Sequence, residues 1–380
     1  MLKRNRVAVL EIGTGKIILT AIGLDKNGKV SLCGKSRREF SGYYGERFLD
    51  DVSVLSEEIK KAAEEVQAVS GEKIKEVFVG APAAFCAHII RDMSYRFGGR
   101  KKITFDDIKK VSEMASVIEG SERYTLIESA AVSYIPGEGG ETSNCIGVTA
   151  SEIRCRFSLI YMDNSFKAFA DKALKDCGIK KVTYISECAS EARYYFDGEE
   201  VGGTPVLLDA GMSGSQYAAS YGRGFSVMGY IPVGGAHISG DLSEKLDMEF
   251  SSAELLKKRI NLNLHPLSKD FYPAEGGDVP VDNCNDIVRK RLDGFSAKLV
   301  KELEKGRGYE NNTKVYLTGG GYGYIKGADK VLEEGIGLEV RPVGEAFTGK
   351  AKAEEGASAG LVKEAARRLI YESEGIYRFE

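Results

Sequence analysis

Three short glycine-bearing turns, each directly after an apolar strand-like run, constrain this chain more than any other feature. They lie at residues 7–16 (VAVLEIGTGK), 206–215 (VLLDAGMSGS) and 315–321 (VYLTGGG). In the first two, a carboxylate ends the strand, a glycine follows two residues later, and a second strand-like run comes next. Glycine lets the main chain approach a ligand without a Cβ clash, so such a turn can present N–H groups to phosphate. Its repetition predicts a duplicated fold that closes on a nucleotide from both sides.

The first two turns carry the candidate phosphate-binding residues. The candidates are Gly13, Thr14, Gly15 and Lys16 in the first turn, and Asp209, Gly211, Ser213, Gly214 and Ser215 in the second. Glu11 and Asp209 end the two strands, where they can hold Mg²⁺, usually through water. These two carboxylates are also the possible catalytic groups. For each turn taken alone, an ordinary β-hairpin is the alternative interpretation.

The third turn and one helix supply candidates for the nucleoside end of a ligand. The turn consists of Gly319, Gly320 and Gly321, and a helical pattern follows it almost at once, so the N-terminal amides of that helix can face a nucleotide. Glu254 and Lys257 lie on one face of an expected helix, where they can bracket a ribose and an adenine. A ligand-free strand-to-helix turn and a solvated ion pair are the alternatives.

The first part of the chain reads as an α/β domain, formed by residues 1–81 and 162–200. Two strands surround the first turn, and a hairpin turn is expected at residues 25–28. A helix at residues 53–69 follows, ended by Gly71, before a returning strand. The residues of this helix expected to face inward are Val54, Ile59, Ala62, Ala63 and Val66.

An insertion and a second domain complete the expected organisation. Residues 82–161 hold three strand-like runs around one helix, which starts with a capping-box pattern at Thr104 and Asp107. They predict a small α+β subdomain inserted in the first domain. Residues 201–380 repeat the strand–turn–strand order of the first domain and include a helical subdomain at about 242–310. The last helix, at residues 357–371, is expected to pack on the core of this second half.

Composition excludes several classes of function. The formal net charge of −3 gives no sign of a nucleic-acid partner. Seven cysteines without a CxxC grouping and three dispersed histidines argue against a metal centre and fit a reducing compartment. No leader sequence precedes the first strand, and no apolar run reaches the ~18 residues of a membrane span. These features predict a cytoplasmic protein.

Together these features resemble the actin-like ATPase superfamily, and within it the FtsA family of bacterial cell-division proteins. Residues 11–16 (EIGTGK) resemble the family's first phosphate motif, DIGTSK. Residues 229–246 (GYIPVGGAHISGDLSEKL) are similar to an IPVGGxHIT-D segment and are the most specific match. Further similar segments are residues 73–89, which lead into the insertion, 103–115 in its helix, 251–259 in an adenine-side helix and 315–327 in the adenosine motif.

The resemblance implies a fold, a ligand and a role. The fold would be two RNase H-like domains around a nucleotide cleft, with an inserted subdomain of the SHS2 type. ATP or ADP with Mg²⁺ would occupy the cleft between the three glycine turns. The protein would be a scaffold that binds an FtsZ-like division polymer and self-associates into filaments, recruited to the division site at the inner face of the membrane.

Departures from the family pattern affect catalysis and membrane binding. Glu11 stands where aspartate is usual, and Met212 and Gln216 replace a glycine and an aspartate of the second motif, DIGGGTTD. A neutral glutamine cannot ligate Mg²⁺ or polarise water as a carboxylate does, so weak or no hydrolysis is expected. The family's amphipathic C-terminal membrane helix has no counterpart, so no intrinsic membrane anchor is expected. Residues 367–371, Tyr377 and Phe379 would make a poor substitute.

Two rival functions remain open at this stage. One is an adaptor of the PilM or EutJ kind, which would serve the assembly of a pilus-type or microcompartment complex. The other is a small-molecule phosphotransferase of the same superfamily, for which Asp209 is the candidate base. No sugar-site pattern accompanies that aspartate.

Overall fold

The structure is a computed structural model that describes residues 6–24, 29–117, 122–199, 201, 203–264, 270–306 and 312–374, with side chains up to residue 370. The expected hairpin turn at residues 25–28 lies outside the described residues, as do Tyr377 and Phe379. No helix in the described ranges is long and apolar enough to cross a membrane.

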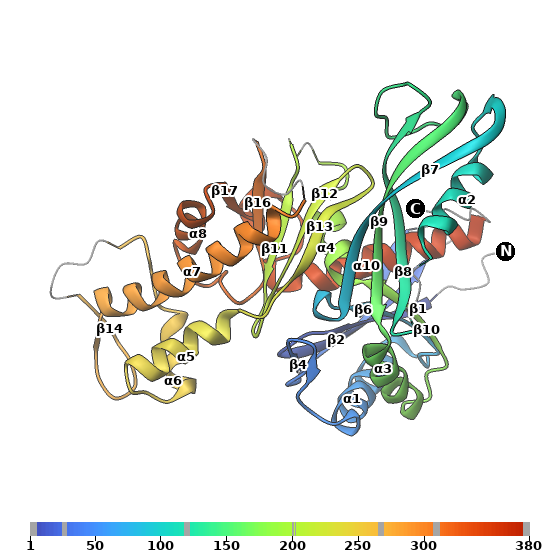
Figure 1. Cartoon of the computed structure of the whole chain (residues 1–380). Coiled ribbons are helices and arrows are strands. Elements are labelled where there is room, and N and C mark those ends of the chain that lie inside the picture. Colours follow the sequence, from blue (N-terminus) through green and yellow to red (C-terminus); the bar gives the residue numbers. More distant parts are fainter. Residues whose placement is uncertain are drawn as a thin grey trace.

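Two five-stranded sheets with the same topology form the framework (Figure 1). The first sheet has the order β10 (Lys181–Ser186), β6 (Glu76–Ala81), β1 (Arg6–Ile12), β2 (Lys16–Leu24), β3 (Val30–Glu39). The second has the order β13 (Gly224–Ile231), β12 (Ser215–Tyr221), β11 (Val206–Ala210), β16 (Lys314–Thr318), β17 (Glu339–Pro342). In each sheet three successive strands pair antiparallel, a later strand adds in parallel to the first of them, and a further strand adds in parallel to that one. The predicted duplication is confirmed at the level of topology.

The central strand β1 is buried on both faces because helices cover both sides of the first sheet. Alternate residues of a strand point to opposite faces. Ala8 and Leu10 accordingly share one core with α1 (Val52–Ser70) and α3 (Asn164–Asp176). Val7 and Val9 share another core with apolar residues of the C-terminal helix. This arrangement fixes the carboxyl end of β1, where the first glycine turn begins.

One residue of α1 faces the other way from the prediction. Val54 is 40% exposed, whereas Leu55, left out of the predicted inward face, is fully buried. Leu55 lies four residues before Ile59 and seven before Ala62, so it falls on the same helical stripe. Gly71 ends the helix as predicted, in a left-handed conformation with φ of 72°.

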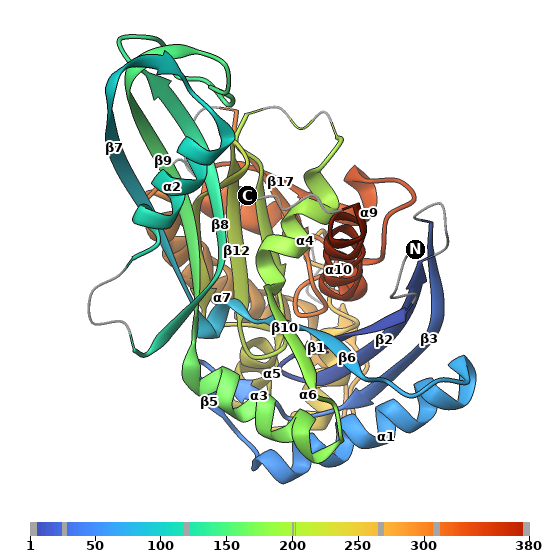
Figure 2. The ribbon, with the colours of Figure 1, turned by 90° about the vertical axis from the view of Figure 1, so that its right-hand side faces the viewer.

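The C-terminal helix α10 (Gly356–Glu374) corrects the expectation that it packs on the second half. Its residues Leu361 and Leu369 lie in the core of the first sheet, and it runs alongside α4 (Glu187–Phe196), as Figure 2 shows. Two glycines allow α10 to pack this closely against β6 and α4. A Cβ atom at Gly80 would lie 2.7 Å from Cδ1 of Leu361, and one at Gly360 would lie 2.6 Å from Cα of Glu191.

The segment between β6 and α3 forms a separate three-stranded antiparallel sheet, the insert, which stands at the upper right of Figure 1. Its elements are, after the short turn η1 (Ala83–Phe85), the strands β7 (Cys86–Lys102), β8 (Tyr124–Pro136) and β9 (Thr149–Asp163) and the helix α2 (Phe105–Ala115). The predicted capping box at the start of α2 is confirmed, since the side chains of Thr104 and Asp107 each accept a hydrogen bond from the other's backbone N–H.

The second sheet shares one core with the helices of the second half. These helices are α5 (Gly235–Lys245), α6 (Phe250–Lys257), α7 (Val281–Leu303) and α8 (Ala328–Ile336). The remaining short elements are β4 (Tyr43–Tyr44), β5 (Arg47–Phe48), β14 (Phe271–Tyr272), β15 (Val279–Pro280), α9 (Val343–Ala346) and η2 (Ala353–Glu355).

The start of α8 corrects the prediction that a helix follows the third glycine turn almost at once. Gly319 and Gly327 both adopt positive φ, and the chain between them forms further turns. Because α8 begins only after Gly327, its N-terminal amides do not follow directly on the glycine turn.

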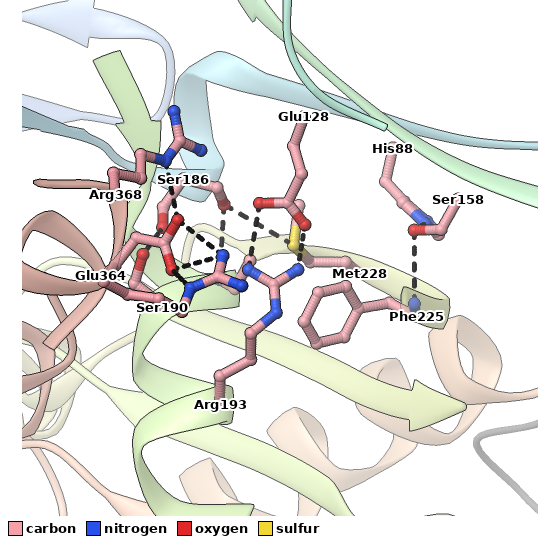
Figure 3. A network of polar contacts seen from close by, with 12 residues as sticks. His88, Glu128, Ser158, Ser186, Ser190, Arg193, Phe225, Met228, Glu364 and Arg368 are labelled. Carbon is pink, nitrogen blue, oxygen red and sulfur yellow. Dashed lines mark hydrogen bonds and ion pairs between the residues drawn. The ribbon is translucent and has the colours of Figure 1, made fainter. Parts of the chain in front are cut away.

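A buried polar network joins the insert to the rest of the molecule (Figure 3). Nη1 of Arg193 on α4 donates to Oε2 of Glu128 on β8 at 3.1 Å, and Nη2 donates to the other carboxylate oxygen. Burial by itself would lower the pKa of the Arg193 guanidinium, but the charge of Glu128 and the hydrogen bonds to it raise that pKa. The hydroxyl of Ser158 on β9 accepts the N–H of Phe225 on β13 at 3.2 Å. The insert is therefore bound to both α4 and the second sheet.

Replacing Glu128 with alanine is expected to destabilise the protein by ~3–5 kcal/mol, because it leaves a buried guanidinium without its partner. Glu152→Ala is the matched control in the same sheet, since Glu152 pairs with Arg96 at 3.3 Å on an exposed surface and should cost at most ~1 kcal/mol. Thermal unfolding of both variants measures the difference. Equal losses in the two variants would contradict the structural role of the buried pair.

Candidate functional site

A cavity of about 300 Å³ lies between the two five-stranded sheets, and its wall contains residues from all three glycine turns. The predicted site residues that line it are Glu11, Gly13, Thr14, Gly15, Lys16, Asp209, Gly211, Gly214, Glu254, Lys257, Gly319, Gly320 and Gly321. The duplicated topology explains this convergence, because the carboxyl ends of β1 and β11 carry equivalent turns at the same edge of their sheets.

Ser213 and Ser215 lie behind the cavity wall formed by the described residues. The hydroxyl of Ser213 donates to the carbonyl of Tyr43 at 3.1 Å, and the hydroxyl of Ser215 donates to the carbonyl of Val233 at 2.7 Å. Both side chains are thus engaged in holding the second turn in shape. Their role as ligand donors stays a prediction.

The first two turns are built alike and touch each other. Each is closed by a backbone hydrogen bond of 2.9 Å, from Gly13 to Lys16 and from Gly211 to Gly214. At their tips, the N–H of Ser213 donates to the hydroxyl of Thr14 at 3.3 Å. The cavity is therefore closed where the two tips meet.

The third turn packs against the second through glycines that admit no side chain. A Cβ atom at Gly319 would lie 2.2 Å from Oδ1 of Asp209, and one at Gly321 would lie 2.2 Å from the carbonyl oxygen of Gly211. Gly320 differs from both, because a Cβ atom there would meet its nearest neighbour, the ring of Tyr324, at an ordinary 3.7 Å. Gly320 therefore has room for a small side chain at the cavity wall.

The Glu254–Lys257 pair forms part of the cavity wall. Nζ of Lys257 lies 2.7 Å from Oε2 of Glu254 and 3.1 Å from the carbonyl oxygen of Gly235. Lys257 is only 3% exposed, and burial lowers its pKa. The alternative interpretation of this pair as a solvated surface ion pair is wrong, because its ammonium group is enclosed by α5 and α6.

Two carboxylates that sequence reasoning missed line the same cavity: Glu187 and Glu191 on α4. With the buried Glu11 and the half-buried Asp209 they form a group of four acids, and loss of contact with water raises the pKa of each. Among the residues that the structure describes, three of their oxygens have no hydrogen-bond partner: Oε2 of Glu11, Oε2 of Glu187 and Oε2 of Glu191.

The groups that stabilise the negative charge of these acids are Lys16, through its own charge, and Gln216, through hydrogen bonds. Nζ of Lys16 lies 3.4 Å from Oε1 of Glu11 and 2.6 Å from the carbonyl oxygen of Glu354. The amide of Gln216 donates to Asp209 at 2.9 Å and to Glu187 at 3.3 Å. An acidic centre with a single lysine and a neutral amide beside it favours either a bound cation or protonated carboxyl groups.

Their pattern in the sequence could have revealed the two missed acids. Glu187 and Glu191 lie four residues apart, so they share one face of a helix. The residues around them (ECASEA) are otherwise small, which marks a helix buried in close packing. Carboxylates on the buried face of such a helix are unusual enough to suggest a site.

Replacing Glu191 with glutamine is expected to stabilise the protein increasingly as pH rises. Glu191 is fully buried, and its raised pKa means that the folded state holds the proton more tightly than the unfolded state. Its contribution is therefore fully present below the unfolded pKa and is lost as pH rises through the folded pKa. A neutral amide of the same shape avoids this loss.

Melting temperatures at pH 5 and pH 8 test this prediction. The variant should exceed the native protein at pH 8 by a few degrees and by less at pH 5, whereas exposed Glu113→Gln should show no such trend. A Glu191→Gln difference that is the same at both pH values would contradict the burial of an ionisable group there.

Sequence comparison relates most of the chain to one kind of protein. No protein-family model matches the chain. It is similar to the cell division protein FtsA of Neisseria meningitidis serogroup B, with 20% identity over 348 residues, covering 87% of this chain and 83% of that protein. It is also similar to FtsA of Enterococcus faecalis, with 23% identity over 374 residues, covering 90% and 80%.

Structural comparison gives neighbours of one fold. PilM in the PilM–PilN type IV pilus biogenesis complex has a TM-score of 0.64 at 16% identity, covering 96% of this chain and 98% of that one. MreB5 of Spiroplasma citri bound to ADP has a TM-score of 0.56 at 11% identity, covering 97% and 98%. The ethanolamine utilization protein EutJ of Carboxydothermus hydrogenoformans has a TM-score of 0.54 at 13% identity, covering 95% and 90%. The chain therefore has the actin-like ATPase fold, and along most of its length its sequence resembles that of FtsA cell-division proteins.

Proposed function

We propose that the cavity binds an adenine nucleotide, ATP or ADP. The observation that carries this proposal is the convergence of three glycine turns and the Glu254–Lys257 pair, from distant parts of the chain, on one cavity. The glycine turns would hold the phosphates through backbone N–H groups, and Lys16 would neutralise part of their charge. The Glu254–Lys257 pair and Gly320 would border the nucleoside. MreB5 of Spiroplasma citri, which has the same fold, is known bound to ADP and to AMPPNP.

Mg²⁺ bound with the nucleotide fits the residues present. Oε2 of Glu11 and Oε2 of Glu187 are buried without a hydrogen-bond partner in the part of the chain that the structure describes, and carboxylate oxygens are the ligands that Mg²⁺ prefers. In the described ranges, no cluster of three or more His, Cys, Asp or Glu side chains has the geometry to hold a metal ion alone. Glu11 and Asp209 would therefore hold the ion through water and the phosphates, where it would offset the charge of the four acids.

The proposed role is that of a nucleotide-dependent scaffold in bacterial cell division, with weak or no hydrolysis. It would bind an FtsZ-like polymer and self-associate into filaments at the inner face of the membrane. The support comes from curated relatives named FtsA that match this chain over most of its length. The proposed domain division has residues 1–81 and 162–200 as the first RNase H-like domain, 82–161 as the insert and 201–380 as the second, except that the last helix α10 packs on the first sheet.

Co-sedimentation with FtsZ polymers from the same cell tests the division role. The native protein should pellet with assembled FtsZ and stay in the supernatant with unassembled FtsZ. A protein that stays in the supernatant in both cases would contradict the proposed partner.

An assembly adaptor for another machine is the second candidate. The observation that favours it is the similarity to PilM, a component of a type IV pilus biogenesis complex, which has the highest TM-score among the neighbours named above. Affinity capture from the native cell distinguishes the two roles, since one predicts FtsZ and the other a component of a different assembly. A phosphotransferase role would require substrate phosphorylation that depends on Asp209.

A further inference from the structure

The two phosphate turns are in contact at a second point besides Thr14 and Ser213. A Cβ atom at Gly15 would lie 2.7 Å from Sδ of Met212 and 3.7 Å from its Cε. The thioether of Met212 therefore extends from the tip of the second turn and lies against the backbone of the first. Met212 is 50% exposed, so it covers this contact from the solvent side, and a group that enters between Gly15 and Met212 has to displace its side chain.

The backbone beneath Met212 is held from the other side. Its carbonyl accepts the N–H of Ala236 at 2.8 Å, and the carbonyl of Gly211 accepts the N–H of Gly235 at 3.0 Å. These N–H groups belong to the first turn of α5, so that helix start is occupied by the second glycine turn. The first turn is closely packed as well, because the backbone at Gly42 lies directly against it. A Cβ atom at Gly42 would lie 2.3 Å from the carbonyl oxygen of Gly13.

Negative charge near the two turns also disfavours a further phosphate. The group of four acids lies beside the turns, and Lys16 is already engaged with Glu11 and Glu354. Each further phosphate adds negative charge next to these acids. The cavity of about 300 Å³ is also at the small end of the ~300–1,000 Å³ range of ligand pockets.

We propose that Met212 closes the far end of the phosphate site, so that the cleft takes a nucleoside diphosphate in preference to a triphosphate. This inference rests on the proposed nucleotide binding and adds a residue that sets its specificity. A diphosphate can lie along the glycine backbones without separating the tips, whereas a terminal third phosphate has to enter between Gly15 and Met212.

Calorimetric titration of the full chain with ADP and with ATP, each with Mg²⁺, tests the proposal. We expect the native protein to bind ADP at least ~10-fold more tightly than ATP, which corresponds to ~1.4 kcal/mol. Met212→Gly should bring the two dissociation constants within about threefold of each other, chiefly by strengthening ATP binding. Met212→Leu, which keeps an apolar side chain of similar volume, should retain the preference.

The outcomes separate this proposal from the one on which it rests. Equal affinities of the native protein for the two nucleotides would overturn the preference, and so would a Met212→Gly ratio equal to the native one. Should Met212→Gly fail to fold, Met212→Ala keeps a Cβ atom on the turn and applies the same test. Absence of binding for both nucleotides, in the native protein and in the variants, would instead contradict nucleotide binding itself.

Discussion

Replacing Gly320 with valine is expected to weaken binding of ADP and ATP by roughly 10- to 100-fold while leaving the fold intact. A Cβ atom at Gly320 makes only ordinary contacts with Tyr324 and Glu354, so the added methyl groups enter the cavity rather than the protein core. Filling a close-packed site costs ~1–3 kcal/mol, and each 1.4 kcal/mol is a factor of ten in affinity. Calorimetry measures the affinity, and thermal unfolding measures the stability.

The neighbouring glycines explain why Gly320 is the informative position. Gly319 and Gly321 lie too close to Asp209 and Gly211 to accept a side chain, so their substitution would disturb the turn itself. Gly99→Val is the matched control, since Gly99 lies in β7 of the insert with open space around its Cβ position. Unchanged nucleotide affinity in a folded Gly320→Val variant would contradict the assignment of this wall of the cavity to the nucleoside.

ATP turnover by the native protein is expected to stay well below ~1 s⁻¹, the lower end of the ordinary enzyme range. Burial raises the pKa of both Glu187 and Glu191, which would suit a base, but the amide of Gln216 donates to Glu187 and to Asp209. The tips of the phosphate turns also leave little room for an attacking water, because Met212 lies against Gly15. Removing a positioned acid or base typically lowers a rate 10²–10⁴-fold.

Steady-state phosphate release by purified protein checks this expectation. The Gly320→Val variant, purified in the same way, corrects for contaminating ATPases because it should bind ATP more weakly. A rate of ~1 s⁻¹ or more that disappears in this variant would contradict a scaffold with weak hydrolysis.

The cleft could be predicted from the sequence because each of its three turns is formed by residues that are neighbours in the chain. Each glycine turn is set by a few neighbouring residues after an apolar strand, so the pattern is visible without tertiary information. The equivalence of Glu11 and Asp209, at the ends of β1 and β11, follows from the same local pattern. Two such turns in two sheets of equal topology bring both carboxylates to one cavity.

What the sequence did not predict depends on contacts between distant segments. The strand β10 was not predicted, because the parallel pairing of Ile185 with Gly80 that makes it a strand is remote in the chain. The acids Glu187 and Glu191 then follow on a helix whose burial results from α10, and α10 itself was assigned to the wrong half. The spacing of the two acids suggests a site, but their place in this cavity depends on where the C-terminal helix packs.

The contact between Met212 and Gly15 could not be predicted from the sequence either. Sequence reasoning treated Met212 as the loss of a glycine from the second turn, which is a local change. Its consequence is nonlocal, because its thioether meets a turn almost 200 residues earlier in the chain. The distance between the two halves decides whether that side chain meets the first turn or lies wholly in solvent.

Titration of the native protein with ADP and Mg²⁺ in a calorimeter shows whether this cleft holds an adenine nucleotide. We expect saturable binding of one ADP per chain, weakened by Gly320→Val and unaffected by Gly99→Val. Absence of binding at millimolar ADP, in a protein that unfolds cooperatively, would contradict it.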